Sequence, residues 1–250
     1  MAIALESSAT TSHLTGTSSL SITLPSGVAE DDLVLIFAVH EADGTLTTPS
    51  GYTLLGTDLA QTGLGGNVCR IYVWYKIAGG SESNPTTTSN TNGENKKFIA
   101  HRLSGCDTST PIPDSDIDST NSGSGSPPSY NIDDISLSSD SSVFFRVAAT
   151  SNTQGGSIDD DDADMPSGYT KRSSLTGNNA AILSIQKDSV SAGAQGTATI
   201  KTTTSGIGTP QAMAFASVGL QASSGGGGGG GGAASSRFEA LMMPSFGDTD

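Results

Sequence analysis

A five-residue motif, Pro-Ser-Gly-Tyr-Thr, occurs twice in this chain, at residues 49–53 and again at residues 166–170. Each copy lies in the same order of segments: a buried strand, the motif, an aliphatic strand and a strand of small residues. The matching segments are offset by roughly 110 to 117 residues, which indicates an internal duplication. A duplicated series of short strands divided by Gly, Pro, Ser and Asn turns is typical of β-sandwiches and jelly rolls.

The individual strand signals support this assignment. Residues 20–24 alternate apolar and polar side chains, whereas the continuous apolar run at 32–39 predicts a strand that is buried on both faces. Abundant Gly, Ser and Thr disfavour long helices. We therefore expect an all-β fold, an antiparallel, jelly-roll-like β-sandwich built from two internally repeated halves. One sandwich is preferred over two small ones, because each half holds too few strands to cover both faces of a core.

Changes in composition divide the chain into segments. A run of glycines at 225–232 buries no side chains and is expected to act as a flexible spacer. The expected organisation is an N-terminal arm (1–19), the β-sandwich (20–222, with halves at about 20–106 and 130–222 and a linker at 107–129), a Gly-rich tether (223–236) and a C-terminal docking peptide (237–250).

The repeated motif is interpreted as a structural turn. Proline presets one backbone angle, glycine supplies a positive φ, and tyrosine then enters the next strand. The tyrosine ring is expected to cap one end of the sandwich, with its hydroxyl bonded to backbone or water. The residues assigned to these turns are Pro49, Gly51, Tyr52, Pro166, Gly168 and Tyr169.

The segment after the glycine run is apolar and has no neighbouring strand or long helix to join. Each large side chain that entered a partner's groove would contribute roughly 1.5–3 kcal/mol before ordering costs. A frayed tail, or a tail docked on its own domain, is the alternative. The residues assigned to partner docking are Phe238, Leu241, Met242, Met243 and Phe246.

Charge limits the classes of partner. The chain has 25 acidic and 11 basic residues, a formal net charge of −14. This balance argues against binding nucleic acid, whose phosphates require Lys and Arg, and against adsorption to anionic membranes. No basic segment with a long apolar stretch follows Met1, so no secretory signal is expected.

Residues that carry chemistry are sparse. The three histidines, His13, His40 and His101, have no zinc-type spacing and no nucleophile motif beside them. His40 followed by Glu41 resembles a base with its orienting carboxylate, but a histidine at a strand end is the preferred interpretation. Cys69 and Cys106 are expected to be small buried thiols. We therefore expect a non-enzymatic protein without a cofactor.

Two acidic segments are candidates for calcium, which binds oxygen-rich loops. Residues 114–118 begin like an EF-hand loop, but Ser119 occupies the glycine position and Gly125 the position of the bidentate glutamate. A solvated acidic loop is the alternative for both segments. A paired-carboxylate glycosidase would need aromatic platforms for its sugar, and aromatic residues are only 5% of this chain. The calcium candidates are Asp159, Asp160, Asp161, Asp162 and Asp164.

Four segments together resemble a family of tailed-phage virion β-sandwich proteins of the head-decoration (cement) or minor-tail type. They are the buried strand at 32–39, the turn at 49–53, the Trp-Tyr-Lys strand at 73–79 and the small-residue strand at 98–105. The resemblance extends over roughly residues 20–220. It implies a β-sandwich structural protein of the virion, assembled in the host cytoplasm, and it carries over no catalytic residue.

Three functions are therefore considered. The first is a capsid decoration or cement protein whose partners are other virion proteins and copies of itself, with a homo-oligomeric state. The second is a tail-tip or fibre module that binds host surface glycans. The third is a secreted carbohydrate-active enzyme, which the missing secretory signal and the missing catalytic constellation disfavour.

Overall fold

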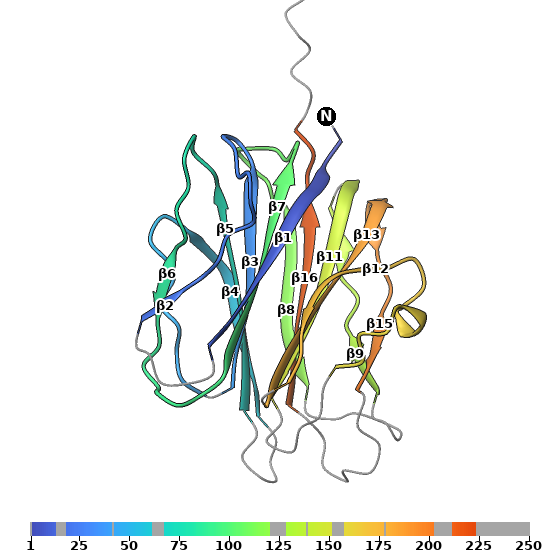
Figure 1. Cartoon of the computed structure of the whole chain (residues 1–250). Helices are drawn as coiled ribbons and strands as arrows, with labels where there is room; N and C mark the ends of the chain where they lie inside the picture. Colours follow the sequence, from blue (N-terminus) through green and yellow to red (C-terminus); the bar gives the residue numbers. More distant parts are fainter. Residues whose placement is uncertain are drawn as a thin grey trace, which may run out of the picture.

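The computed structural model describes residues 2–13, 19–41, 43–61, 68–120, 129–138, 140–151, 158–177, 179–202 and 212–223. Two five-stranded antiparallel sheets pack face to face as a β-sandwich (Figure 1), which confirms the predicted fold class. Within the described residues the helical structure is one short 3-10 turn, η1 (Asp162–Asp164), so these residues contain no candidate for a membrane-spanning helix.

The two sheets have the same strand order. The first sheet runs β1-β7-β3-β5-β4, and the second, starting from its β8 edge, runs β8-β16-β11-β13-β12. Each strand of the first sheet therefore has a counterpart at the same place in the second. The strands are β1 (Ala4–His13), β3 (Leu33–His40), β4 (Thr53–Gln61), β5 (Val68–Ile77), β7 (Lys96–Ser104), β8 (Asp114–Thr120), β11 (Ser141–Ser151), β12 (Thr170–Leu175), β13 (Ala180–Val190) and β16 (Ala212–Leu220).

Strand register repeats as well. Leu33 of β3 pairs with Leu103 of β7, and their counterparts Val143 of β11 and Leu220 of β16 pair in the same way. This pairing has the spacing predicted from the sequence. The duplication is therefore present in the backbone and not only in the repeated motif.

An irregularity in the ladder is also duplicated. The register between β4 and β5 shifts between Leu54 and Gly56, and the register between β12 and β13 shifts between Lys171 and Ser173. Both shifts follow the Pro-Ser-Gly-Tyr-Thr motif directly. A β-bulge bends the strand that carries it and increases its twist, so both halves enter their edge strand with the same local irregularity.

Short ribbons cover the outer faces of both sheets. Leu20 and Ile22 pack on the outer face of the first sheet, and Tyr130 and Ile132 pack on the outer face of the second. This arrangement has four layers, and it explains why β3 is apolar from Leu33 to Val39: both of its faces are buried, as predicted. The ribbons are β2 (Ser19–Ser21) with β6 (Thr86–Thr88), β9 (Ser129–Ile132) with β15 (Ala198–Lys201), and β10 (Ser136–Leu137) with β14 (Gly193–Ala194).

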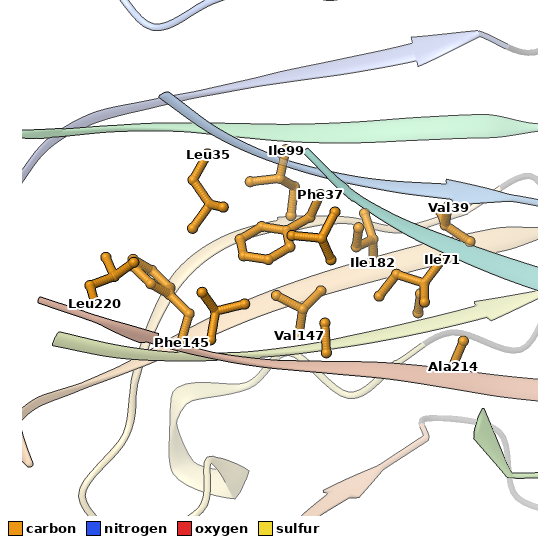
Figure 2. Packing of buried hydrophobic residues seen from close by; sticks show 14 of the residues in the cluster. Leu35, Phe37, Val39, Ile71, Ile99, Phe145, Val147, Ile182, Ala214 and Leu220 are labelled. Atoms are coloured by element: carbon orange, nitrogen blue, oxygen red, sulfur yellow. The ribbon is translucent and has the colours of Figure 1, made fainter. Parts of the chain in front are cut away.

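The main core lies between the two sheets. Figure 2 shows Leu35, Phe37 and Ile99 from the first sheet facing Phe145 and Val147 from the second. All five side chains are fully buried. Burial of such side chains removes apolar surface from water, which is the largest favourable contribution to folding.

Two strands of the five-stranded sheets lie in segments that were expected to be an arm and a linker. The expected arm at 1–19 contains β1, and the expected linker at 107–129 contains β8. Both are edge strands with mostly polar side chains, and β8 has a single apolar residue, Ile117. An edge strand buries little, so its hydrophobic pattern is weak. The expected tether and docking peptide, residues 223–250, lie outside the described residues apart from Ser223.

Both described ends of the chain lie at one end of the sandwich (Figure 1). The backbone amide of Ser223 donates to the carbonyl oxygen of Gly105 (2.9 Å), and a Cβ atom on Gly105 would collide with the carbonyl oxygen of Ala2. Gly105 also has a φ of 74°, which other residues rarely adopt. This glycine therefore allows both chain ends to pack against one turn.

Candidate functional site

The two copies of the repeated motif form the same turn. The Tyr52 amide donates to the carbonyl oxygen of Pro49 (3.1 Å), and the Tyr169 amide donates to that of Pro166 (3.0 Å). Gly51 and Gly168 have φ values of 80° and 81°, respectively. These values agree with the glycine role expected from the sequence.

The tyrosines of the motif also have the same surroundings. Lys76 Nζ lies 5.8 Å from the centre of the Tyr52 ring, and its counterpart Lys187 lies 5.9 Å from the Tyr169 ring. Neither phenol hydroxyl bonds to another described group, and burial raises the pKa of both tyrosines. The duplicated geometry supports a structural role for the motif.

His40 and Glu41 do not work as a pair. The His40 ring contacts the Gly44 carbonyl oxygen (3.2 Å) and the Thr91 hydroxyl (3.0 Å), whereas the Glu41 carboxylate accepts from Asn95. Burial, and to a lesser extent the charge of Lys96, lowers the pKa of His40 to about 4. His40 is therefore a neutral side chain that closes the end of its strand.

His101 lies between the two sheets. Its Nε2 is 2.8 Å from the Ser184 hydroxyl and its Nδ1 is 2.7 Å from the Ser8 hydroxyl. The ring stacks on Phe145 at 5.0 Å, and burial lowers its pKa to about 3. A base, nucleophile and orienting acid are the parts of an activated-nucleophile site, and no carboxylate contacts this histidine among the described residues. The arrangement is a buried polar contact across the core.

The acidic run at 159–164 lies over β12 and β15. Asp160 and Asp162 lie 3.9 and 3.7 Å from Lys171, and Asp164 forms an ion pair with Lys201. The described part of the chain contains no group of three acidic, His or Cys side chains that fits a metal ion. Three of the five candidate calcium residues, Asp160, Asp162 and Asp164, thus have their carboxylates near lysines, whereas the Asp159 carboxylate accepts from the Asp161 amide (3.1 Å). The series that begins at Asp114 forms β8 and not a calcium loop.

Both cysteines, Cys69 and Cys106, are buried and free, as the sequence suggested. Burial raises the pKa of each thiol, that of Cys106 to about 12. A thiol needs a low pKa and access to solvent to react at neutral pH. These cysteines are therefore core residues.

Arg146 is an unexpected charge in the second half. Its side chain is fully buried beneath Tyr169, and its guanidinium lies 5.3 Å from the Phe144 ring and 5.6 Å from the Tyr169 ring. One nitrogen donates to Gly196, but Nε and Nη1 are buried and have no partner among the described groups. The counterpart in the first half is the apolar Ile36. Burying unpaired donors is unfavourable.

Replacing Arg146 with methionine is expected to raise the free energy of unfolding by about 1–2 kcal/mol, because an apolar side chain of similar size removes the unpaired donors. Urea denaturation measures the change. The matched control is Arg102→Met. Arg102 Nε donates to Asp32 (2.6 Å), so its loss is expected to lower the free energy of unfolding by about 1–3 kcal/mol. A loss of stability in Arg146→Met would contradict this expectation, because it would show that the contacts of the guanidinium with Gly196 and the two rings outweigh its unpaired donors.

Two polar hollows open on the described surface. One, of about 310 Å³, lies over Tyr52, Lys76, Glu82 and Asn84. The other, of about 280 Å³, lies between β8 and β9, and its lining includes Asp118, Thr120, Asn131, Asp133 and Phe215.

The second hollow is lined by two aspartates, Asp118 and Asp133. A hydrogen bond with Asp118, and then burial, raise the pKa of Asp133, so the two side chains interact with each other in the hollow. Sequence reasoning missed this pair, because the two residues were assigned to a linker and to the start of the second half. The folded ribbon β9 brings them together.

A comparison of the chain with protein-family models, with curated proteins and with solved structures found no match.

Proposed function

We propose that this chain is a non-enzymatic structural protein of a tailed-phage particle and that it decorates the assembled capsid shell. The observation that supports this proposal is the four-layered, duplicated sandwich with both described chain ends at one end. Such a module is rigid, and it presents its two ends to one side. The resemblance of residues 20–220 to virion β-sandwich proteins supports the same function.

The described surface suits a protein that coats a particle. Leu54, which is 42% exposed, is the one large apolar side chain that the described residues leave strongly exposed. The formal net charge of −14 keeps free copies apart by repulsion. Attachment is assigned to the C-terminal docking peptide, residues 237–250, which starts beyond the described residues, with capsid subunits or neighbouring copies as its partners.

Ending the chain after Ser223 is expected to leave the sandwich folded and to reduce its occupancy on particles about tenfold or more. Loss of several buried apolar anchors would weaken binding by at least this factor. Occupancy is measured by mixing purified protein with particles that lack it and counting bound copies after sedimentation. Circular dichroism and the melting temperature check the fold.

The matched control keeps the docking peptide and replaces residues 225–232 with a Gly-Ser linker of equal length, which is expected to bind normally. The double variant Phe238→Ala, Phe246→Ala separates the side chains from the length of the tail, and it is expected to bind like the truncated chain. If the truncated protein still binds particles at full occupancy, the C-terminal peptide is not the docking segment.

A further inference from the structure

The hollow between β8 and β9 has a filled counterpart in the first half of the chain. Phe98 of β7 and Phe215 of β16 occupy the same place in the two sheets, since each lies equally far before the paired residues Leu103 and Leu220. Thr11 of β1 pairs with Phe98, and Asp118 of β8 pairs with Phe215. The environments of the two phenylalanines can therefore be compared position by position.

In the first half an imidazole covers this phenylalanine. The His13 ring meets the Phe98 ring edge-on at 5.9 Å, and its Nε2 lies 3.0 Å from the carbonyl oxygen of Ser21. Next to it, the hydroxyl of Thr11 accepts a hydrogen bond from the backbone amide of Thr23 (2.8 Å). The space between the sheet edge and the ribbon is thus occupied by the chain's own nitrogen-bearing ring.

In the second half no ring of the described residues takes this place. Thr120 stands where the first half has His13, and a hollow of about 280 Å³ lies over Phe215, which is itself only 2% exposed. The two threonines are replaced as well. Asp118 stands for Thr11, and Asp133 stands for Thr23, because Asp133 lies three residues after Tyr130 of its ribbon as Thr23 lies three residues after Leu20. The loss of an imidazole thus coincides with the gain of two carboxylates.

The carboxylates carry a charge that the described residues do not balance. No Lys, Arg or His nitrogen of the described ranges lies within ion-pair distance of Asp118 or Asp133. One Asp118 oxygen accepts a hydrogen bond from the Ser119 amide (2.7 Å), and the nearby charge of Asp118 contributes to the raised pKa of Asp133. A cation between two close carboxylates removes their repulsion directly.

We propose that this hollow is a socket for one basic side chain of a partner protein, held by Asp118 and Asp133 over Phe215. The hollow has the place and the aromatic floor of the His13 site, which fits a flat or extended cationic group. The segment 121–128, which joins β8 to β9, contains no Lys, Arg or His and cannot supply the cation. A basic partner surface also matches the net charge of −14.

The test is a titration of the full-length ¹⁵N-labelled protein with short blocked peptides, followed by amide chemical shifts. The probes are acetyl-Gly-Lys-Gly-amide and its Arg and His analogues. The peptide with acetyl-lysine in the centre is the uncharged control. Binding of the charged peptides is expected to shift the amides of β8 and β9, and the acetylated peptide is expected to leave them unchanged.

Three variants assign the binding to the socket. Asp118→Thr with Asp133→Thr installs the residues of the first half and is expected to weaken binding about tenfold or more. Thr120→His fills the hollow with the chain's own imidazole and is expected to block the peptides while it raises the melting temperature. His13→Thr opens the first-half site without carboxylates and is expected to create no second binding site.

Peptide binding that survives both the double aspartate change and Thr120→His would overturn the proposed socket. Equal binding of the acetylated peptide would overturn it as well. A separate titration with calcium chloride tests for a metal site. If calcium shifts the amides of β8 and β9 and none of the basic peptides does, the hollow is a metal site and not a socket for a basic side chain. The inference does not require the particle. If the protein binds the peptides but is never found on a virion, the proposed function fails and the socket stands.

Discussion

Replacing Phe145 with alanine is expected to lower the free energy of unfolding by about 3–5 kcal/mol. This side chain is fully buried between the sheets, where its ring lies 6.2 Å from Phe37 and 5.0 Å from His101. Its removal leaves a cavity that two rigid sheets are poorly able to close. Urea denaturation followed by circular dichroism measures the loss.

The control for this variant is Leu54→Ala. Leu54 is the large apolar side chain that is 42% exposed, so a change of less than about 0.5 kcal/mol is expected. A loss at Phe145 as small as that at Leu54 would mean that the two sheets do not pack face to face through this residue.

Acid is expected to destabilise the protein strongly between about pH 6.5 and pH 4, because two histidines are buried in the neutral form. Burial lowers the pKa of His101 to about 3, below the value of about 6.5 in the unfolded chain. The unfolded chain thus binds the proton first, and stability falls as the pH falls through this range. The loss for His101 amounts to about 3 kcal/mol between pH 7 and pH 4, and His40 adds to it.

The internal repeat suggests a variant that tests whether His101 causes the acid sensitivity. Val218 and Val73 are the counterparts of His101 and Ser184, and both lie in the same inter-sheet core. The double variant His101→Val, Ser184→Val replaces the polar contact with that apolar pair. Unfolding by urea at a series of pH values is expected to show a shallower acid dependence. An unchanged dependence would place the acid sensitivity at other groups.

The architecture could be predicted from the sequence because the duplication leaves a strong pattern. The continuous run at 32–39 predicts a strand buried on both faces, and the ribbons over the sheets explain that burial. The repeated turns at 49–53 and 166–170 mark where each half enters its edge strand. These signals are local: they consist of apolar runs and turn residues that are close together in the sequence, so a single sequence displays them.

The edge strands and the hollow could not be predicted in this way. β1 and β8 are polar, and their assignment depends on pairing with β7 and β16, which lie far away in the sequence. Asp118 and Asp133 meet only because β9 folds back over the second sheet. The signal that would have found them is the comparison of the two halves, in which two threonines become aspartates and a histidine becomes a threonine.

The most direct test of the proposed function is electron cryo-microscopy of washed particles that carry this protein. The account predicts density for a four-layered sandwich on the outer face of the shell, with its chain ends directed toward a capsid subunit or a neighbouring copy. Density confined to the tail, or absence of the protein from washed particles, would contradict a capsid decoration protein.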